Sequence, residues 1–143
     1  MKAVLIGRHS LLPIQTRMLE KLGIEIVRQV PQVPTSPQEI SQFVAQLKAE
    51  GVEAIVIQAL PMAVLATLLQ EAKKHGIKVL TFEQETIFTG SVEEAKKLVE
   101  EKPERRTLLT APNAPARVIE AKAISELTEI KIEKKTLITA EEV

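Results

Sequence analysis

The chain has 143 residues, of which 45% are hydrophobic and 27% are charged, and its formal net charge is zero. This length fits a single globular domain, because folded domains are most often about 100 to 150 residues long. The neutral balance removes the general attraction to nucleic acid and to anionic membranes, so neither is an expected partner. The apolar stretch before Gly7 is too short for a signal peptide, and no stretch has the roughly 18 apolar residues of a membrane span. A cytoplasmic protein is therefore expected.

Several residue types are missing from the chain. There is no Cys, Trp or Tyr, and the printed sequence also contains no Asp. These absences exclude thiolate nucleophiles, cysteine metal sites, aspartyl-phosphate chemistry and the usual Ser-His-Asp triad. With only three Phe residues, a stacking platform for single-stranded bases is not expected either. Abundant Glu and Lys with one Asn favour a thermophilic source, although the Gln content is high.

Strands and helices alternate over the first hundred residues. Gly23, Gly51 and Gly76 each follow an amphipathic run and precede an apolar one, which is typical of a helix that ends in a left-handed glycine. The predicted strands between the helices are, in chain order, 2–6, 24–30, 54–58 and 79–82. The predicted helices begin near Pro13, at Ser36-Pro37, near Pro61, and at Ser91, the last covering Val92 to Glu101.

This alternation repeats every 25 to 28 residues or so, roughly the length of a βα unit. Consecutive parallel strands require right-handed crossovers. The sequence therefore predicts an α/β fold with a doubly wound, mainly parallel sheet of the Rossmann or flavodoxin type.

The last third of the chain departs from this rhythm. A fifth strand is predicted at 107–111, and after the turn at 112–115 the segments 117–124 and 129–138 alternate apolar with polar residues. Such alternation is typical of half-exposed antiparallel strands. We therefore expect one domain, 1–143, with βα units over 1–111 and a β extension over 112–143.

The β extension is expected either to widen the sheet or to cover the edge of a partner. Glu133, Lys134 and Lys135 are charges that would blunt an exposed edge. We therefore predict that the chain forms a homo-oligomer, a homodimer joined through the β extension.

A ligand in an open parallel sheet binds outside the carboxyl ends of the strands. Arg8, His9 and Ser10 follow the first strand and supply a cation, an imidazole and a hydroxyl close to a helix N-terminus, where a small anionic molecule is favoured. The alternative is that Ser10 caps the helix, Arg8 pairs with a Glu, and His9 decorates a loop. The other segments expected after strands are Gln58, then Glu83-Gln84-Glu85, and Thr110 to Asn113.

A second candidate site is the turn Thr89-Gly90-Ser91, whose small hydroxyl residues open the last helix. Glu93 and Glu94 follow at once and would repel an anion while completing a capping box, which favours a structural role. A metal site would combine His9 with Glu83 or Glu85, too few donors at no recognised spacing, so no metal is expected. No G-x-G-x-x-G or GK[ST] motif is present, so no cofactor is predicted either.

The stretch from Ser36 to Leu80 resembles the first lobe of periplasmic sugar-binding proteins and their repressor relatives. The resemblance lies in a helix, Gly51-Val52-Glu53-Ala54-Ile55-Val56-Ile57, a second helix, and Gly76-Ile77-Lys78-Val79. Those families hold sugars with Asp, Asn and aromatic residues, which this sequence almost entirely lacks. The resemblance therefore implies a shared βα arrangement rather than a sugar site.

Gly7 to Ser10 and Thr89 to Ser91 resemble in kind two segments of the Rossmann-like nucleotide-sensing domains of CRISPR-associated proteins. In that family a cluster after the first strand and a Thr-Gly-rich turn opening a later helix surround the ligand. The Lys that follows the second turn in the family is replaced here by Glu93 and Glu94. The resemblance implies a ligand-sensing role.

Three functions remain as hypotheses. The first is a non-enzymatic binding or sensor module for a small anionic or nucleotide-like molecule, held by Arg8, His9 and Ser10 with Thr89 and Ser91. The second is an enzyme of phosphoester or acyl chemistry with His9 as general base, for which no orienting carboxylate can be named. The third is an interaction protein that acts through a homo-oligomer formed by its C-terminal strands.

Overall fold

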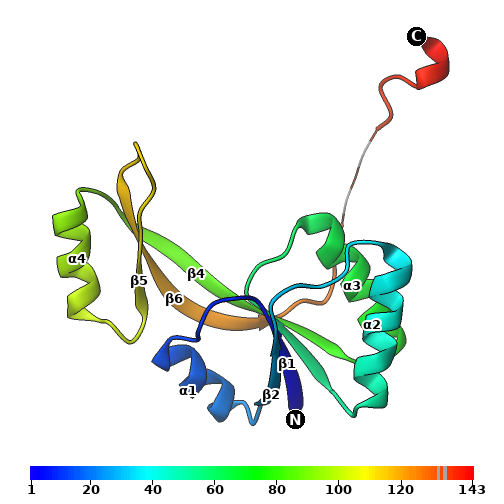
Figure 1. Cartoon of the computed structure of the whole chain (residues 1–143), viewed down its shortest axis with the longest axis horizontal. Coiled ribbons are helices and arrows are strands. Elements are labelled where there is room, and N and C mark those ends of the chain that lie inside the picture. The colour runs from blue at the N-terminus through cyan, green and yellow to red at the C-terminus, as the bar shows by residue number, and fades with distance from the viewer. Residues whose placement is uncertain (132, 134) are drawn as a thin grey trace.

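The computed structural model describes residues 1–131, 133 and 135–143, which fold as an α/β chain around one mixed, six-stranded sheet (Figure 1). The strand order is β2-β1-β3-β4-β6-β5, with β1 to β4 parallel and β6 antiparallel to both β4 and β5. The expected mainly parallel α/β sheet with antiparallel strands toward the C-terminus is confirmed at this level. The strands are β1 (Lys2–Ile6), β2 (Glu25–Val30), β3 (Ala54–Ile57), β4 (Lys78–Gly90), β5 (Arg106–Leu109) and β6 (Ala116–Glu126).

The helices begin and end where the local sequence predicts. Gly23, Gly51 and Gly76 follow the first three helices with φ of 72°, 81° and 68°, the left-handed conformation that glycine adopts without a Cβ clash. The Ser36 hydroxyl accepts the Glu39 N–H at 3.3 Å, and Ser91 caps the last helix in the same way. The helices are α1 (Pro13–Lys21), α2 (Pro37–Ala49), α3 (Met62–Lys74) and α4 (Val92–Glu101).

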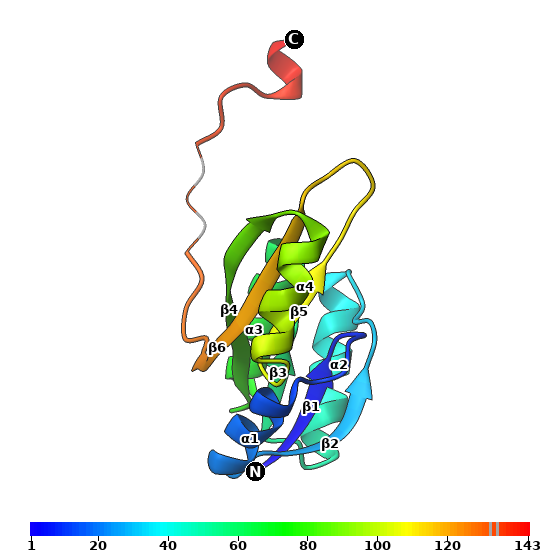
Figure 2. The same cartoon turned by 90° about the vertical axis from the view of Figure 1, so that its left-hand side faces the viewer.

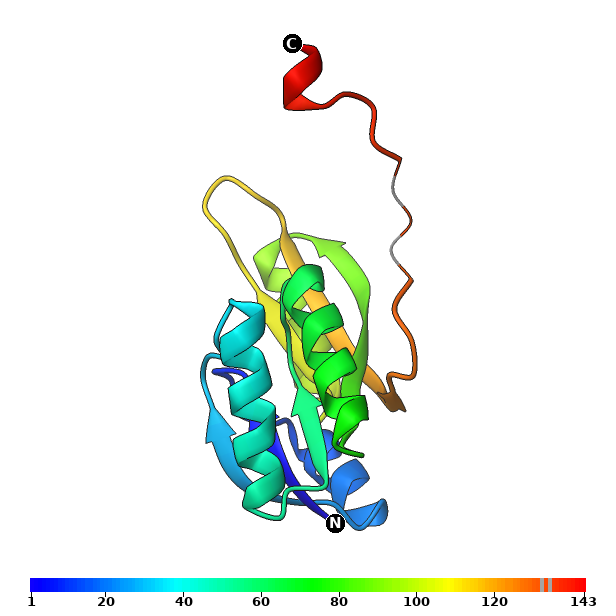
Figure 3. The same ribbon diagram turned by 90° about the vertical axis from the view of Figure 1, so that its right-hand side faces the viewer.

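Two apolar cores lie on opposite faces of the parallel strands. On one face α1 places Leu19 against Leu5 and Val56 of the sheet. On the other face α2 and α3 lie side by side (Figure 3), and Val44 and Leu68 pack against the strands with side chains that water does not reach. Because both faces are covered, the three central parallel strands β1, β3 and the start of β4 are nearly continuous apolar segments.

β4 continues well beyond the parallel part of the sheet and pairs with β6 as far as Gly90 and Ala116 (Figure 2). The prediction that this strand ends at residue 82 is therefore wrong. β5 joins only β6, at the edge of the sheet, so it does not continue the parallel series. We call β5, β6, the outer part of β4 and α4 the ribbon half, and the remainder of the sheet with α1, α2 and α3 the parallel half.

A charged network connects the elements of the ribbon half. Arg106 of β5 donates from Nε to Glu120 of β6 at 3.1 Å and from a terminal nitrogen to the backbone carbonyl of Leu98 in α4 at 2.7 Å. Lys122 donates to the second carboxylate oxygen of Glu120. The side chain of Glu120 is only 8% exposed, so these donors replace most of its hydration. The hydrogen bond from Lys122, with that from Arg106, holds the pKa of Glu120 below its usual value.

The described residues of the predicted strand at 129–138 form no strand; residues 132 and 134 lie outside the described part of the chain. The Leu127 N–H donates to the Val79 carbonyl at 2.8 Å, and Ile130 packs against the core under α2 and α3. Beyond that point the described residues form no strand as far as a short 3₁₀ turn, η1 (Ala140–Glu142), which lies away from the sheet and its helices (Figures 1 and 3). Both sides of β6 are occupied by β4 and β5, and the described residues of the segment do not pair with the free outer edges of the sheet at β2 and β5.

The charged residues expected to protect an exposed strand edge therefore do not have that role where the structure describes them. Glu133 and Lys135 lie on no strand, and Lys134 lies outside the described residues.

Candidate functional site

The loop after β1 is held by the side-chain amides of two glutamines. Gln29, at the end of β2, donates to the carbonyls of Gly7 at 2.8 Å and His9 at 3.1 Å. Gln58, just after β3, donates to the His9 carbonyl at 2.7 Å and accepts the His9 N–H at 3.1 Å. The Gly7 N–H donates to the carbonyl of Val30 at 2.9 Å. Five hydrogen bonds, from the ends of the two strands on either side of β1, therefore hold the backbone of Gly7 and His9.

Gly7 allows Gln58 to lie directly over this loop. Its φ of 148° is a conformation that residues with a side chain rarely adopt. A Cβ at Gly7 would lie 1.9 Å from Oε1 of Gln58 and 2.7 Å from its Cβ. The space that the glycine leaves is thus filled by the amide of Gln58.

The three side chains predicted to bind an anion project outward from this loop. Arg8, His9 and Ser10 are all exposed. Among the residues that the structure describes, no ion pair joins Arg8 to a carboxylate, so the alternative in which a Glu neutralises it is not found. The loop therefore offers an unpaired guanidinium on a restrained backbone.

The start of α1 differs from the expectation. Ser10 does not cap α1, because the N-cap is Leu12 and its N–H is accepted by Oε1 of the buried Gln15 at 2.9 Å. Pro13 has no N–H, and the Ile14 N–H donates to the carbonyl of Glu104 at 3.1 Å. The backbone donors of this helix start are consequently already satisfied by the chain itself.

The start of α3 is more open. The N-cap of α3 is Pro61, and in the described part of the chain no side chain caps this helix. α3 begins only a few residues after Gln58, so its first N–H groups lie at the same edge of the sheet as the β1 loop. A helix start of this kind favours negative charge nearby.

The remaining predicted site residues lie along β4 and are not brought to the β1 loop. Glu83 and Glu85 are inside the strand, opposite Ala123 and Glu120 of β6. Thr89 and Gly90 end β4, and Ser91 is the N-cap of α4. Thr89 lies eight residues beyond Thr81, the last residue of β4 that pairs with β3, which corresponds to about 25 Å of strand.

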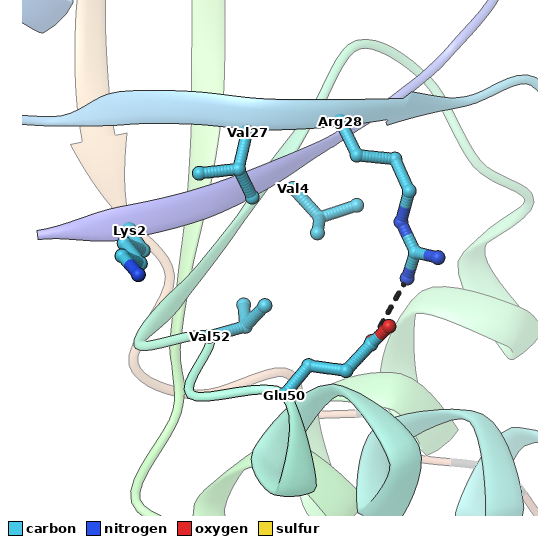
Figure 4. A pocket seen from close by; sticks show the side chains of 6 residues that line it. All are labelled: Lys2, Val4, Val27, Arg28, Glu50 and Val52. Carbon is cyan, nitrogen blue, oxygen red and sulfur yellow. Dashed lines mark hydrogen bonds and ion pairs between the residues drawn. The ribbon is translucent and has the colours of Figure 1, made fainter.

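The structure also shows two shallow hollows, both at the amino ends of the strands. One, of about 280 Å³, has a floor of Val4, Val27 and Val52 and is bridged by an ion pair of 3.1 Å between Arg28 and Glu50 (Figure 4). The other, of about 290 Å³, lies where the start of β4 meets the segment after β6. Neither hollow is lined by any of the predicted site residues.

The described residues contain no group of three or more His and Glu side chains placed to hold a metal ion. None of their helices has both the length and the hydropathy needed to cross a membrane.

Sequence reasoning included Gln58 but missed Gln29 and Gln15. Gln29 lies next to the carboxyl end of its strand, which is the same positional signal that identified Gln58. Gln15 is the third residue of α1, the position from which a side chain reaches back to the N-cap. Both positions were recognisable from the sequence. A neutral amide, however, has neither the charge nor the nucleophilic group that identifies most candidate site residues.

Comparisons with known proteins give no assignment. No family model matches the chain, and no curated protein matches it. A solved structure described as a solution structure of a phosphate-loop protein is similar at 16% identity and a TM-score of 0.34, covering 71% of this chain and 88% of that one. A likeness at this level supports no conclusion about fold or function.

Proposed function

We propose that the chain is a non-enzymatic binding module for a small molecule that carries an oxyanion, such as a phosphate or carboxylate. The observation that carries this proposal is the restrained β1 loop, which presents the exposed and unpaired Arg8 between the ends of β1 and β3. β2 lies on one side of β1, whereas β3 and β4 lie on the other. We take this order as support for a doubly wound, flavodoxin-like arrangement, in which ligands bind at the point where the strand order reverses.

In this proposal each group has a defined role. The guanidinium of Arg8 makes paired hydrogen bonds to two oxygens of the anion, a geometry that lysine does not offer. Ser10 adds a hydroxyl donor and His9 an imidazole beside it. The uncapped start of α3 contributes the positive end of a helix dipole. Because the loop is held before the ligand arrives, little ordering entropy is lost on binding.

A catalytic role for His9 is less well supported. A general base is normally oriented by a third group, yet none of the described hydrogen bonds joins the His9 imidazole to a carboxylate. Glu83 and Glu85, the predicted assistants, are held within β4 opposite β6. We therefore assign the loop to binding rather than to bond cleavage.

The test is a thermal-shift panel of phosphometabolites and nucleotides, the latter included because of the resemblance to nucleotide-sensing domains. A ligand at 100 times its dissociation constant should stabilise the fold by about 2.7 kcal/mol. Arg8→Ala should abolish that gain, whereas Arg17→Ala, which removes an exposed cation from α1, should preserve it. No stabilisation by any compound, or equal stabilisation of the Arg8→Ala variant, would contradict the proposal.

The end of the chain supports a second candidate function, an interaction through the C-terminal segment. Leu137 and Ile138 are 88% and 63% exposed, which is unusual for two adjacent apolar residues. Sedimentation at micromolar concentration should show a dimer for the full chain and a monomer for a chain ending at Ile130, which keeps the contacts of Leu127 and Ile130 with the core. A full chain that sediments as a monomer would remove this candidate.

A further inference from the structure

Gln58 makes contacts with the β1 loop that Gln29 does not make. Both amides donate to the His9 carbonyl, and Gln29 also holds the Gly7 carbonyl. Only Gln58 accepts the His9 N–H, and only Gln58 fills the space above Gly7. The loop would therefore keep its carbonyl contacts to Gln29 if the amide of Gln58 moved away.

The place that Gln58 fills is the one a ligand would need. In α/β folds a glycine after the first strand lets a ligand approach the backbone closely, because no Cβ is in the way. Here the oxygen Oε1 of Gln58 takes that approach, at 3.1 Å from the His9 nitrogen. A carboxamide oxygen and an oxyanion oxygen accept the same N–H in the same geometry.

We infer that Gln58 is an internal latch, whose amide oxygen occupies the position that an oxygen of the bound anion takes when Gln58 swings out. The inference rests on the binding function proposed above and adds to it a specific exchange at the His9 N–H. In the ligand-free protein this exposed donor is held by Oε1 of Gln58. Binding then replaces the two hydrogen bonds of Gln58 to His9 by one from His9 to the anion, while Gln29 holds the loop.

The latch predicts that one variant binds inorganic phosphate more tightly than the wild type and that two variants bind it more weakly, as measured by NMR titration. Gln58→Ala removes the competing oxygen, and its affinity should rise by about tenfold, roughly the weight of one net hydrogen bond. Gln58→Glu keeps an acceptor at the His9 N–H and adds a negative charge, so its affinity should fall below that of the wild type. Gln29→Ala loosens the loop without opening the position, and its affinity should also fall.

The same titration separates failure of the latch from failure of the binding function. If the wild type binds phosphate and Gln58→Ala binds no more tightly, the latch is wrong while the binding function stands. If Gln58→Ala weakens binding as much as Gln29→Ala does, Gln58 is a brace like Gln29, and the latch is equally wrong. If neither the wild type nor Gln58→Ala binds phosphate, both inferences fall. An unchanged ¹H–¹⁵N spectrum outside the loop verifies that each variant is folded.

Discussion

The parallel half and the ribbon half of this sheet are stabilised by different means. Among the largest side chains that water does not reach, all but Val118 belong to the parallel half. In the ribbon half the fully enclosed apolar residues are Ala95, Ala116 and Val118, and the chain adds the ion pairs of Glu120. A two-layer unit with so little apolar volume depends more on its polar contacts, because small side chains bury little area.

The largest effect is expected in the parallel half. Leu68→Ala removes a fully buried side chain between α3 and the sheet and leaves a cavity, so it should lower the free energy of unfolding by about 3 to 4 kcal/mol. Urea denaturation measures this directly. The matched control is Leu137→Ala, the same change at an 88% exposed position, which should stay within about 0.5 kcal/mol. Similar values for the two variants would show that the core does not lie where the structure places it.

A smaller and more local effect is expected at Arg106. Arg106→Met keeps much of the side-chain length but removes the donors to Glu120 and to the Leu98 carbonyl. It should cost about 2 to 3 kcal/mol because the Glu120 carboxylate is largely shielded from water and the bond to Leu98 is part-buried. Hydrogen exchange should show the loss first in α4 and β5.

The control for this variant is Arg28→Met, which breaks an ion pair whose partners are 46% and 37% exposed and should change stability by less than about 1 kcal/mol. Equal loss of protection in α2 and α4 of the Arg106→Met protein would contradict the division into two halves.

The smallest expected effect is a pH dependence of folding stability that comes from Glu120 in the ribbon half. The pKa of Glu120 is lowered in the folded chain by Lys122 and Arg106. The ionised carboxylate therefore contributes fully to the free energy of unfolding above its pKa in the unfolded chain, about 4.3, and this contribution is lost as the pH falls through the lower pKa of the folded chain. The stability difference between the wild type and Glu120→Gln should therefore be constant from pH 7 to about pH 5 and shrink below it. Unfolding in urea at pH 7, 5 and 3 measures this difference, and a difference that grows in acid would contradict a lowered pKa of Glu120 in the folded chain.

Local sequence signals predicted much of the parallel half. β1 has the bounds that were expected, and the glycines after α1, α2 and α3 end those helices. In the ribbon half, α4 also has its expected bounds. These features depend on residues within a few positions of one another, such as a serine that caps the N–H three residues later. Among the site residues, Arg8, His9, Ser10 and Gln58 are the ones that lie together at the ends of β1 and β3.

The ribbon half was predicted less well, and the polar run in β4 shows why. Residues 83–86 are all exposed, and three of them, Glu83, Gln84 and Glu85, resemble a loop more than a strand. They are extended because β6, more than thirty residues later, pairs with them, and a long-range partner leaves no mark on the local pattern. The alternating residues at 129–138 illustrate the opposite case, since a strand-like pattern alone forms no strand, and the described residues of that range pair with no strand of the sheet.

The β1 loop illustrates the same division. The sequence by itself determined that a cation, an imidazole and a hydroxyl follow the first strand, and that a glycine precedes them, because these are matters of residue type and local order. Only the tertiary structure decided that Gln29 and Gln58 meet over that loop, that the Glu104 carbonyl accepts the Ile14 N–H at the start of α1, and that Thr89 to Ser91 lie far along the ribbon. Each of those contacts joins residues whose proximity depends on strand order and strand length, which long-range pairing decides.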